Sequence, residues 1–305
     1  MGQANEHRAD RGEPGREGGD RGEPGRDEPR TGTRRDRGGR LTLALVDAGI
    51  GLLAAAAAVR RLRPDADLVL SCDPDSMPWD SRSAPDLTAR ALALAAPTAA
   101  YRPDALIVAC GTATLRALPA LRARLEPPVP VLGALPAIAP AVAAGGPVAV
   151  WTGPATADSP QLLRLIRASG RGNPVTPVPC PGLSDAVERA DEAAISSAVA
   201  SAARRTPGGV RTVVLGCTHF ELVAEHVRAA LRRPGSPLLL HGSAGTVAAR
   251  ALRRIGEPPA PRAPARGTLT VLLNGREAPL PTAALAYGEG RLLRAASPAL
   301  RAVRA

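Results

Sequence analysis

Short apolar runs alternate with longer stretches rich in Ala, Leu and Arg from residue 41 onward. A run that is apolar throughout is typical of a strand buried in a parallel sheet, and the longer stretches have helical spacing. Strands are predicted at 41–46, 67–71, 105–109, 129–133, 148–152, 212–215, 238–240 and 268–273. Helices are predicted at 51–62, 84–96, 112–121, 159–168, 184–203, 220–231 and 243–255, before a Pro-rich linker at 258–264 and a C-terminal helix. This alternation predicts an α/β fold of βαβ units around parallel sheets.

Residues 1–40 have a different composition. The heptapeptide DRGEPGR occurs at 10–16 and again at 20–26, and ten Arg nearly balance nine Asp and Glu in this stretch. A segment with so little apolar surface cannot offset the entropy of ordering its chain. We therefore predict a disordered tail over 1–40. It is interpreted as a solubilising extension, with an interaction tail as the alternative.

Composition narrows the classes of protein. The 305 residues are 45% hydrophobic but only 2% aromatic, and the net charge of +11 comes from Arg, since Lys is absent. Because few aromatic residues are present to stack on bases, no nucleic-acid partner is expected. Four cysteines are too few for a disulfide scaffold, and no long apolar run or secretory signal is found. We expect a cytoplasmic protein with no membrane partner. The sequence does not decide whether the protein forms a homodimer.

Candidate chemistry follows three of the predicted strands. In open α/β sheets, ligands bind beyond the carboxyl ends of the strands. Asp47 follows the first strand, Cys110 the third, and Cys217 and His219 the strand at 212–215. Each position is flanked by small or polar residues where a helix can begin.

The two cysteines have matching surroundings. ALIVACGTA (105–113) and TVVLGCTHF (212–220) both read as a strand, a small residue, Cys, and then a Thr opening a helix. A helix N-terminus favours the thiolate, so two such thiols on opposite sides of one pocket suit racemisation by two bases. The alternative for either residue is a small buried hydrophobe, and Cys72 and Cys180 lack such surroundings. No CxxC, GxSxG or complete dinucleotide fingerprint is present, so neither a metal nor a cofactor is predicted.

Several motifs together resemble the glutamate racemase family. LALVDAGIGL resembles its strand followed by Asp-Ser-Gly, IVACGTA its ACNTA motif, and LGCTHFEL its GCTHF/Y motif. WTGPATADS loosely resembles a Thr-rich segment of the family, and CPGLSDAVE its Cys-Pro…Val-Glu segment. The matches fall in the family's order between about 41 and 290.

The resemblance implies two pseudo-symmetric α/β domains with the active site in the cleft between them. Domain A would comprise 41–132 plus 246–297, domain B 133–245, with a C-terminal tail at 298–305. The catalytic residues it implies are Cys110 and Cys217 as acid/base thiols, flanked by Asp47 and His219, with Glu188 in support. The substrate-binding positions it implies are Ala48, Pro78, Trp79, Asp80, Gly111, Thr112 and Thr218. The substrate would be an amino acid, and D-glutamate the product for peptidoglycan synthesis.

Departures from the family concern substrate recognition. Family Ser is Ala48 here, family Tyr-Gly is Trp79-Asp80, and family Asn is Gly111. Each buried polar group left unpaired costs about 1–3 kcal/mol of binding, and Asp80 would repel an anionic substrate if it faced the pocket. Gly111 and Ala48 are expected to open the pocket. Two alternatives to a glutamate racemase therefore stay open: a racemase or isomerase of altered specificity, and a non-catalytic paralogue that binds a ligand or partner.

Overall fold

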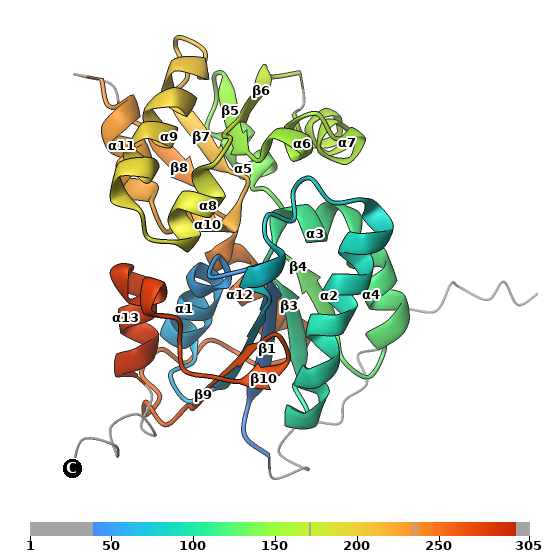
Figure 1. Cartoon of the computed structure of the whole chain (residues 1–305). Coiled ribbons are helices and arrows are strands. Elements are labelled where there is room, and N and C mark those ends of the chain that lie inside the picture. The colour runs from blue at the N-terminus through green and yellow to red at the C-terminus, as the bar shows by residue number, and fades with distance from the viewer. Residues whose placement is uncertain (1–38, 171, 234, 236, 297–305) are drawn as a thin grey trace, which may run out of the picture. The chain divides into compact units, whose positions relative to one another are not determined.

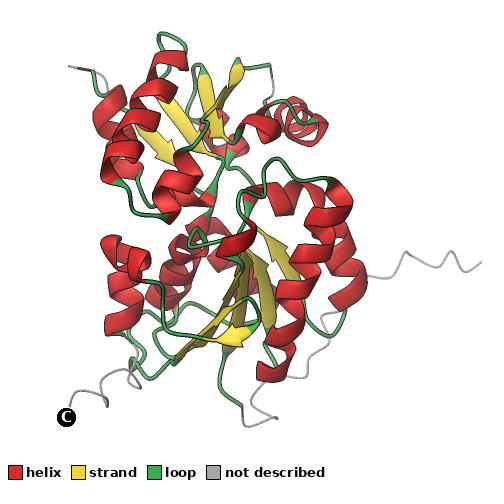
Figure 2. Ribbon diagram, viewed as in Figure 1, coloured by secondary structure: helices red, strands yellow, loops and turns green. Residues whose placement is uncertain are grey.

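A computed structural model describes residues 39–170, 172–233, 235 and 237–296 (Figures 1 and 2). The tails predicted at 1–40 and 298–305 lie outside the described residues, apart from Gly39 and Arg40. Within the described part, the strands form two sheets flanked by helices, and nearly all strand pairs are parallel. The predicted α/β class with mainly parallel sheets is confirmed. In the same residues, no helix is long and apolar enough to cross a membrane.

The first sheet has the order β10-β9-β2-β1-β3-β4 among the described residues. Its strands are β1 (Thr42–Asp47), β2 (Asp67–Cys72), β3 (Ala105–Val108), β4 (Val131–Gly133), β9 (Leu269–Leu273) and β10 (Arg276–Glu277). Only β10 runs antiparallel to its neighbour. The central strands β1 and β3 are apolar and almost wholly buried, as expected of strands covered on both faces. Their carboxyl ends therefore lie side by side at one edge of the sheet.

The second sheet has the order β6-β5-β7-β8, all parallel. Its strands are β5 (Val148–Thr152), β6 (Val175–Pro179), β7 (Thr212–Leu215) and β8 (Leu239–His241). The strands of the first sheet come from residues 42–133 and 269–277, and those of the second from 148–241. The domain boundaries given above stay a prediction.

Helices connect the strands and cover the sheets. They are α1 (Leu52–Leu62), α2 (Ala84–Thr98), α3 (Gly111–Arg116), α4 (Leu118–Leu125), α5 (Ile138–Ala143), α6 (Pro154–Ala157), α7 (Pro160–Ser169), α8 (Leu183–Glu188), α9 (Glu192–Arg205), α10 (Thr218–Glu221), α11 (Ala224–Leu231), α12 (Ala244–Arg254) and α13 (Gly288–Ala295). Side chains of Ser83, Ser159 and Asp191 cap α2, α7 and α9 by accepting backbone N–H groups of the first turn. Most residues of α1 are buried, and many of them are alanines, whose small side chains allow α1 to pack against α12 and α13.

The structure differs from the predicted elements where a strand contains proline or where a predicted helix is interrupted. The strand β6 was not predicted because it contains Pro177 and Pro179, which a strand at the edge of a sheet tolerates. The helix predicted at 112–121 is two helices that meet at Ala117, one residue before Leu118-Pro119. The predicted helix at 184–203 breaks near Ala190, whose φ is 52°. The helix predicted at 220–231 breaks at Leu222–Val223, and α5 and β10 were missed.

Candidate functional site

The two cysteines that the sequence pairs occupy equivalent places in the structure. Cys110 is the extended residue before α3, with φ −130° and ψ 120°, and Cys217 is the extended residue before α10, with φ −117° and ψ 134°. Their turns touch: a Cβ on Gly111 would lie 2.4 Å from the carbonyl oxygen of Gly216. The structure thus brings together the two strand ends that carry the thiols.

Asp47 belongs to the first of two hydrogen-bonded groups around the cysteines, which are called relay groups below. This last residue of β1 is 1% exposed. Its Oδ1 accepts a hydrogen bond from the Ala48 N–H (2.7 Å), its Oδ2 accepts one from the Thr218 hydroxyl (2.9 Å), and it is hydrogen-bonded to the Cys110 thiol. Burial raises the pKa of Asp47 to about 6, although the charge of His219 and these hydrogen bonds oppose the rise. Asp47 is therefore ionised at neutral pH but able to take up a proton.

Cys217, His219 and Glu188 form the second relay group. The Cys217 sulfur lies 3.9 Å from His219 Nδ1, and His219 Nε2 donates to Glu188 Oε2 at 3.0 Å. The same carboxylate oxygen accepts the Ile50 N–H at 2.8 Å, which fixes its position. Burial acts to lower the pKa of His219, but its hydrogen bonds to Cys217 and Glu188 outweigh burial and raise that pKa well above its usual value. The raised pKa makes His219 a good base for a proton shared with the Cys217 sulfur.

Two glycines make room for both groups. A Cβ on Gly49 would lie 2.2 Å from Glu188 Oε2, and a Cβ on Gly51 would lie 2.5 Å from Asp47 Oδ2 and 2.6 Å from His219 Nδ1. In the sequence, this Gly-Ile-Gly run is an incomplete dinucleotide fingerprint and part of the motif that resembles the family's Asp-Ser-Gly segment. Its glycines instead let the β1–α1 turn approach the acidic and basic side chains closely.

Burial decides the state of the Cys110 thiol. Cys110 is 8% exposed, and its pKa is raised well above the usual value, first by burial and then by the negative charge of Asp47. The expectation that the helix N-terminus would hold this thiol as a thiolate is therefore wrong, because the short helix α3 cannot offset the loss of water. Cys72 and Cys180 are also buried, with raised pKa values, and take no part in either relay group.

Iodoacetamide is expected to alkylate Cys217 faster than Cys110 near neutral pH. Cys217 is half-buried and lies beside His219, whereas Cys110 is buried and held as a neutral thiol. Labelling of peptides followed over time by mass spectrometry measures both rates, with the buried Cys72 and Cys180 as internal controls. Equal rates at Cys110 and Cys217 would contradict this description of the two thiols.

The predicted recognition residues differ in their placement. The Trp79 side chain is buried (3% exposed) and its Nε1–H donates to Ser76 Oγ at 2.8 Å, so the ring packs in the core rather than over a ligand. Pro78 is exposed, and Ala48 is buried. The expectation that Gly111 opens the pocket is wrong, because the backbone at Gly111 lies against Gly216. For Ala48 the same expectation stays a prediction.

A chain of polar groups next to Cys110 includes Asp80. The Thr112 and Thr156 hydroxyls are 3.0 Å apart, and the Thr156 hydroxyl also donates to Asp80 Oδ1. The backbone N–H groups of Ala155 and Thr156 donate to the same carboxylate at 2.7 and 2.8 Å. Thr156 was not predicted, although it lies in the Thr-rich segment noted in the sequence. Thr218, another predicted substrate-binding residue, does not belong to this chain of polar groups, because its hydroxyl donates to Asp47.

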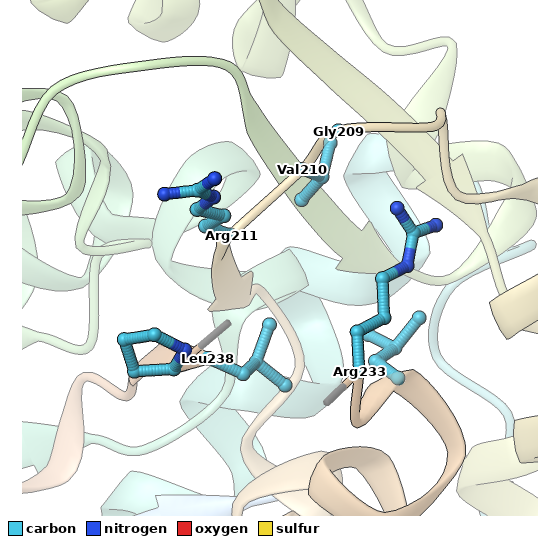
Figure 3. Close-up of a pocket in the computed structure, with 7 residues that line it drawn as sticks. Gly209, Val210, Arg211, Arg233 and Leu238 are labelled. Atoms are coloured by element: carbon cyan, nitrogen blue, oxygen red, sulfur yellow. The ribbon is translucent and has the colours of Figure 1, made fainter. Parts of the chain in front are cut away.

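A separate hollow lies away from these groups. It has a volume of about 110 Å³, and the residues that line it include Val210, Arg211, Arg233 and Leu238, which are labelled in Figure 3. Val210 and Arg211 precede β7, whereas Cys217 follows it, and a strand of four residues spans about 13 Å. The hollow therefore lies at the opposite end of β7 from Cys217. Among the described residues, no group of three or more His, Cys, Asp or Glu side chains is arranged to hold a metal ion.

Comparisons with known proteins agree with the motifs and the fold. The Asp/Glu/Hydantoin racemase family model matches residues 52–249. A glutamate racemase of Roseiflexus sp. (strain RS-1) is 36% identical over 223 residues, which cover 70% of this chain and 79% of the relative. The crystal structure of Escherichia coli glutamate racemase with L-glutamate and an activator, UDP-MurNAc-ala, superposes with a TM-score of 0.67 at 25% identity, covering 81% of this chain and 92% of that one. Thermus thermophilus glutamate racemase, solved with beta-chloro-D-alanine, gives a TM-score of 0.60 at 26% identity and covers 76% of this chain and 87% of that one. With its two cysteine-bearing turns in contact and its sequence and fold matched in this way, the chain belongs to the Asp/Glu/Hydantoin racemase family.

Proposed function

We propose that this chain is a cofactor-independent amino-acid racemase that interconverts L- and D-glutamate by means of Cys110 and Cys217. The observation that carries the proposal is the symmetry of the two thiols. They sit on touching turns after β3 and β7, and each has its own proton-relay partner, Asp47 for Cys110 and His219 for Cys217. The glutamate substrate is taken from the names of the relatives.

The proposed reaction removes a proton from one face of the substrate's Cα and adds a proton to the other face. One thiolate removes the Cα proton and becomes a thiol, while the opposite thiol gives its proton to the other face and becomes a thiolate. For Cys110 to act as the base, its proton must first pass to Asp47, whose pKa of about 6 makes it a stronger base than an exposed carboxylate. For Cys217, His219 is the group that exchanges the proton, and Glu188 stabilises its positive charge. Backbone N–H groups in the two turns would hold the substrate's α-carboxylate.

Circular dichroism of the free amino acid tests the proposal. Purified protein incubated with L-glutamate or with D-glutamate is expected to lose the optical signal of either enantiomer and to end at the racemic mixture, without added metal or pyridoxal phosphate. A panel of other amino acids is run in parallel. If no member of the panel is racemised, the non-catalytic alternative gains support and the proposal fails.

Asp47→Asn is expected to abolish turnover and yet to stabilise the folded protein above pH 6. A carboxyl whose pKa rises from 3.8 unfolded to about 6 folded binds protons more tightly when folded, so stability falls as pH rises through that range. The cost of the charged form at neutral pH is about 3 kcal/mol at most, at about 1.36 kcal/mol for each pKa unit. Urea unfolding is expected to show the Asp47→Asn variant more stable than the wild type by about 1–3 kcal/mol above pH 6, with the gain vanishing near pH 4. A gain that does not change with pH, or retained turnover, would contradict this role of Asp47.

The product of this reaction, D-glutamate, would serve peptidoglycan synthesis in the cytoplasm. The proposal does not depend on whether the protein is a homodimer.

A second substrate class is favoured by one observation. Asp80 places a carboxylate one residue beyond Trp79 and joins it to Thr112 through Thr156. An acidic substrate would meet that charge, so a racemase acting on an amino acid with an uncharged side chain is the second candidate function.

A further inference from the structure

The backbone of Asp80 is held firmly on both sides. The preceding residue, Trp79, is buried and hydrogen-bonded to Ser76. The Arg116 guanidinium of α3 donates to the carbonyl oxygen of Asp80 at 3.3 Å and to that of Arg82 at 2.7 Å. These contacts fix the position from which the Asp80 side chain extends.

The Asp80 carboxylate is bound to the first turn of α6. It accepts the N–H groups of Ala155 and Thr156 and the Thr156 hydroxyl. Gly153 leaves the space that this requires, since a Cβ there would lie 2.5 Å from Asp80 Cγ. Charge-assisted hydrogen bonds of this kind are about twice as strong as neutral ones, so the carboxylate is held in one position.

The Asp80 charge sets the direction of the hydrogen bond between the Thr156 and Thr112 hydroxyls. Each threonine hydroxyl has one proton to donate. Thr156 gives its proton to Asp80, so the bond between the Thr156 and Thr112 hydroxyls is donated by Thr112. Thr112 lies two residues after Cys110, in the first turn of α3. Its hydroxyl therefore offers a ligand only lone pairs.

We propose that Asp80 is a specificity-determining residue that disfavours acidic side chains and favours uncharged side chains able to donate a hydrogen bond. Two effects act in the same direction: a second carboxylate meets a fixed like charge, and the Thr112 hydroxyl has no proton to give it. A side-chain amide suffers neither penalty and can donate to Thr112. The preferred substrate class is then amino acids such as glutamine rather than glutamate. This inference rests on the proposed racemase function of the same site and refines its substrate.

Glutamine and glutamate form a matched pair for the test, since they differ only in the terminal group. We expect kcat/KM for racemisation of glutamine to exceed that for glutamate by about tenfold or more in the wild-type protein. In Asp80→Asn and Asp80→Gly, the ratio of the two kcat/KM values is expected to fall about tenfold, mainly through better use of glutamate. Asp158→Asn is the control, because it removes the same charge from an exposed residue at the other end of α6.

Calorimetric titration with glutamine and with glutamate measures the same preference without turnover. A protein that racemises neither amino acid but binds glutamine more tightly, with the preference lost in Asp80→Asn, would overturn the proposed function and support the selectivity of Asp80. Equal use or binding of the two amino acids by the wild type, or a ratio unchanged in both Asp80 variants, would overturn the role of Asp80. The conservative Asp80→Asn variant guards against a loss of folding in Asp80→Gly.

Discussion

Replacement of either Cys110 or Cys217 by Ser is expected to lower kcat/KM for glutamate racemisation by about 10²- to 10⁴-fold, the usual contribution of a positioned acid or base. A serine hydroxyl keeps the shape of the thiol but is far too weak an acid to exchange protons with Asp47 or His219. Because the overall equilibrium constant between enantiomers is one, each substitution must lower kcat/KM equally for the L and the D substrate. The initial loss of optical signal from each enantiomer measures this directly.

Cys180→Ser is the matched control for the two thiol variants. Cys180 is buried, and its sulfur donates to the carbonyl oxygen of Val178 at 3.3 Å, a bond that a serine hydroxyl can also make. We expect activity close to that of the wild type. Full activity in Cys110→Ser or in Cys217→Ser would remove that thiol from the mechanism.

Gly51→Ala is expected to lower kcat/KM by about 10²-fold while the protein still folds, since misplacing a reacting group by about 1 Å costs that much. Gly51 has φ −55° and ψ −28°, so alanine adopts its backbone conformation without strain. The added methyl group would instead lie 2.5 Å from Asp47 Oδ2 and 2.6 Å from both His219 Nδ1 and Thr218 Oγ1. One methyl group therefore displaces members of both relay groups.

Gly245→Ala provides the control for this substitution. Gly245 lies in α12, and a Cβ there meets nothing within 4 Å. Alanine in a helix is favoured over glycine by up to about 1 kcal/mol, so this variant should be slightly more stable and equally active. Steady-state kinetics and urea unfolding of both variants separate the effect on the site from the effect on the fold. Unchanged activity in Gly51→Ala would show that the two relay groups are not as closely packed as the structure indicates.

Sequence patterns singled out the candidate site residues because the signals that mark them are local in the sequence. A buried parallel strand is apolar throughout, and its carboxyl end is where a functional residue must lie, so Asp47, Cys110 and Cys217 were found from β1, β3 and β7. The edge strand β6 was missed because its two prolines hide the strand pattern. An edge strand tolerates proline, since the missing N–H groups would have faced solvent. Among the described residues, the two strands that were missed, β6 and β10, both lie at the edge of a sheet, whereas the other two edge strands, β4 and β8, are apolar enough to have been predicted.

Contacts between distant segments were not predictable from local pattern. The pKa of Cys110 depends on how much water reaches it, which the order of residues does not specify. The approach of Gly111 to Gly216 joins segments more than 100 residues apart in the sequence, so an open pocket was predicted where the backbone is closed. In the same way, the bond between Asp80 and α6 depends on where the turn after β5 lies relative to the loop after β2.

In the proposed mechanism, two different groups act on opposite faces of Cα, and the position of deuterium in the product distinguishes this mechanism from one with a single base. L-glutamate is incubated with the protein in D₂O, and both enantiomers are separated and analysed by mass spectrometry while only a small fraction has reacted. Two opposed thiols predict that the newly formed D-glutamate carries deuterium at Cα while the remaining L-glutamate keeps its proton. Proton retained in the D product, or deuterium entering both enantiomers at the same early rate, would point to a single base and contradict the account.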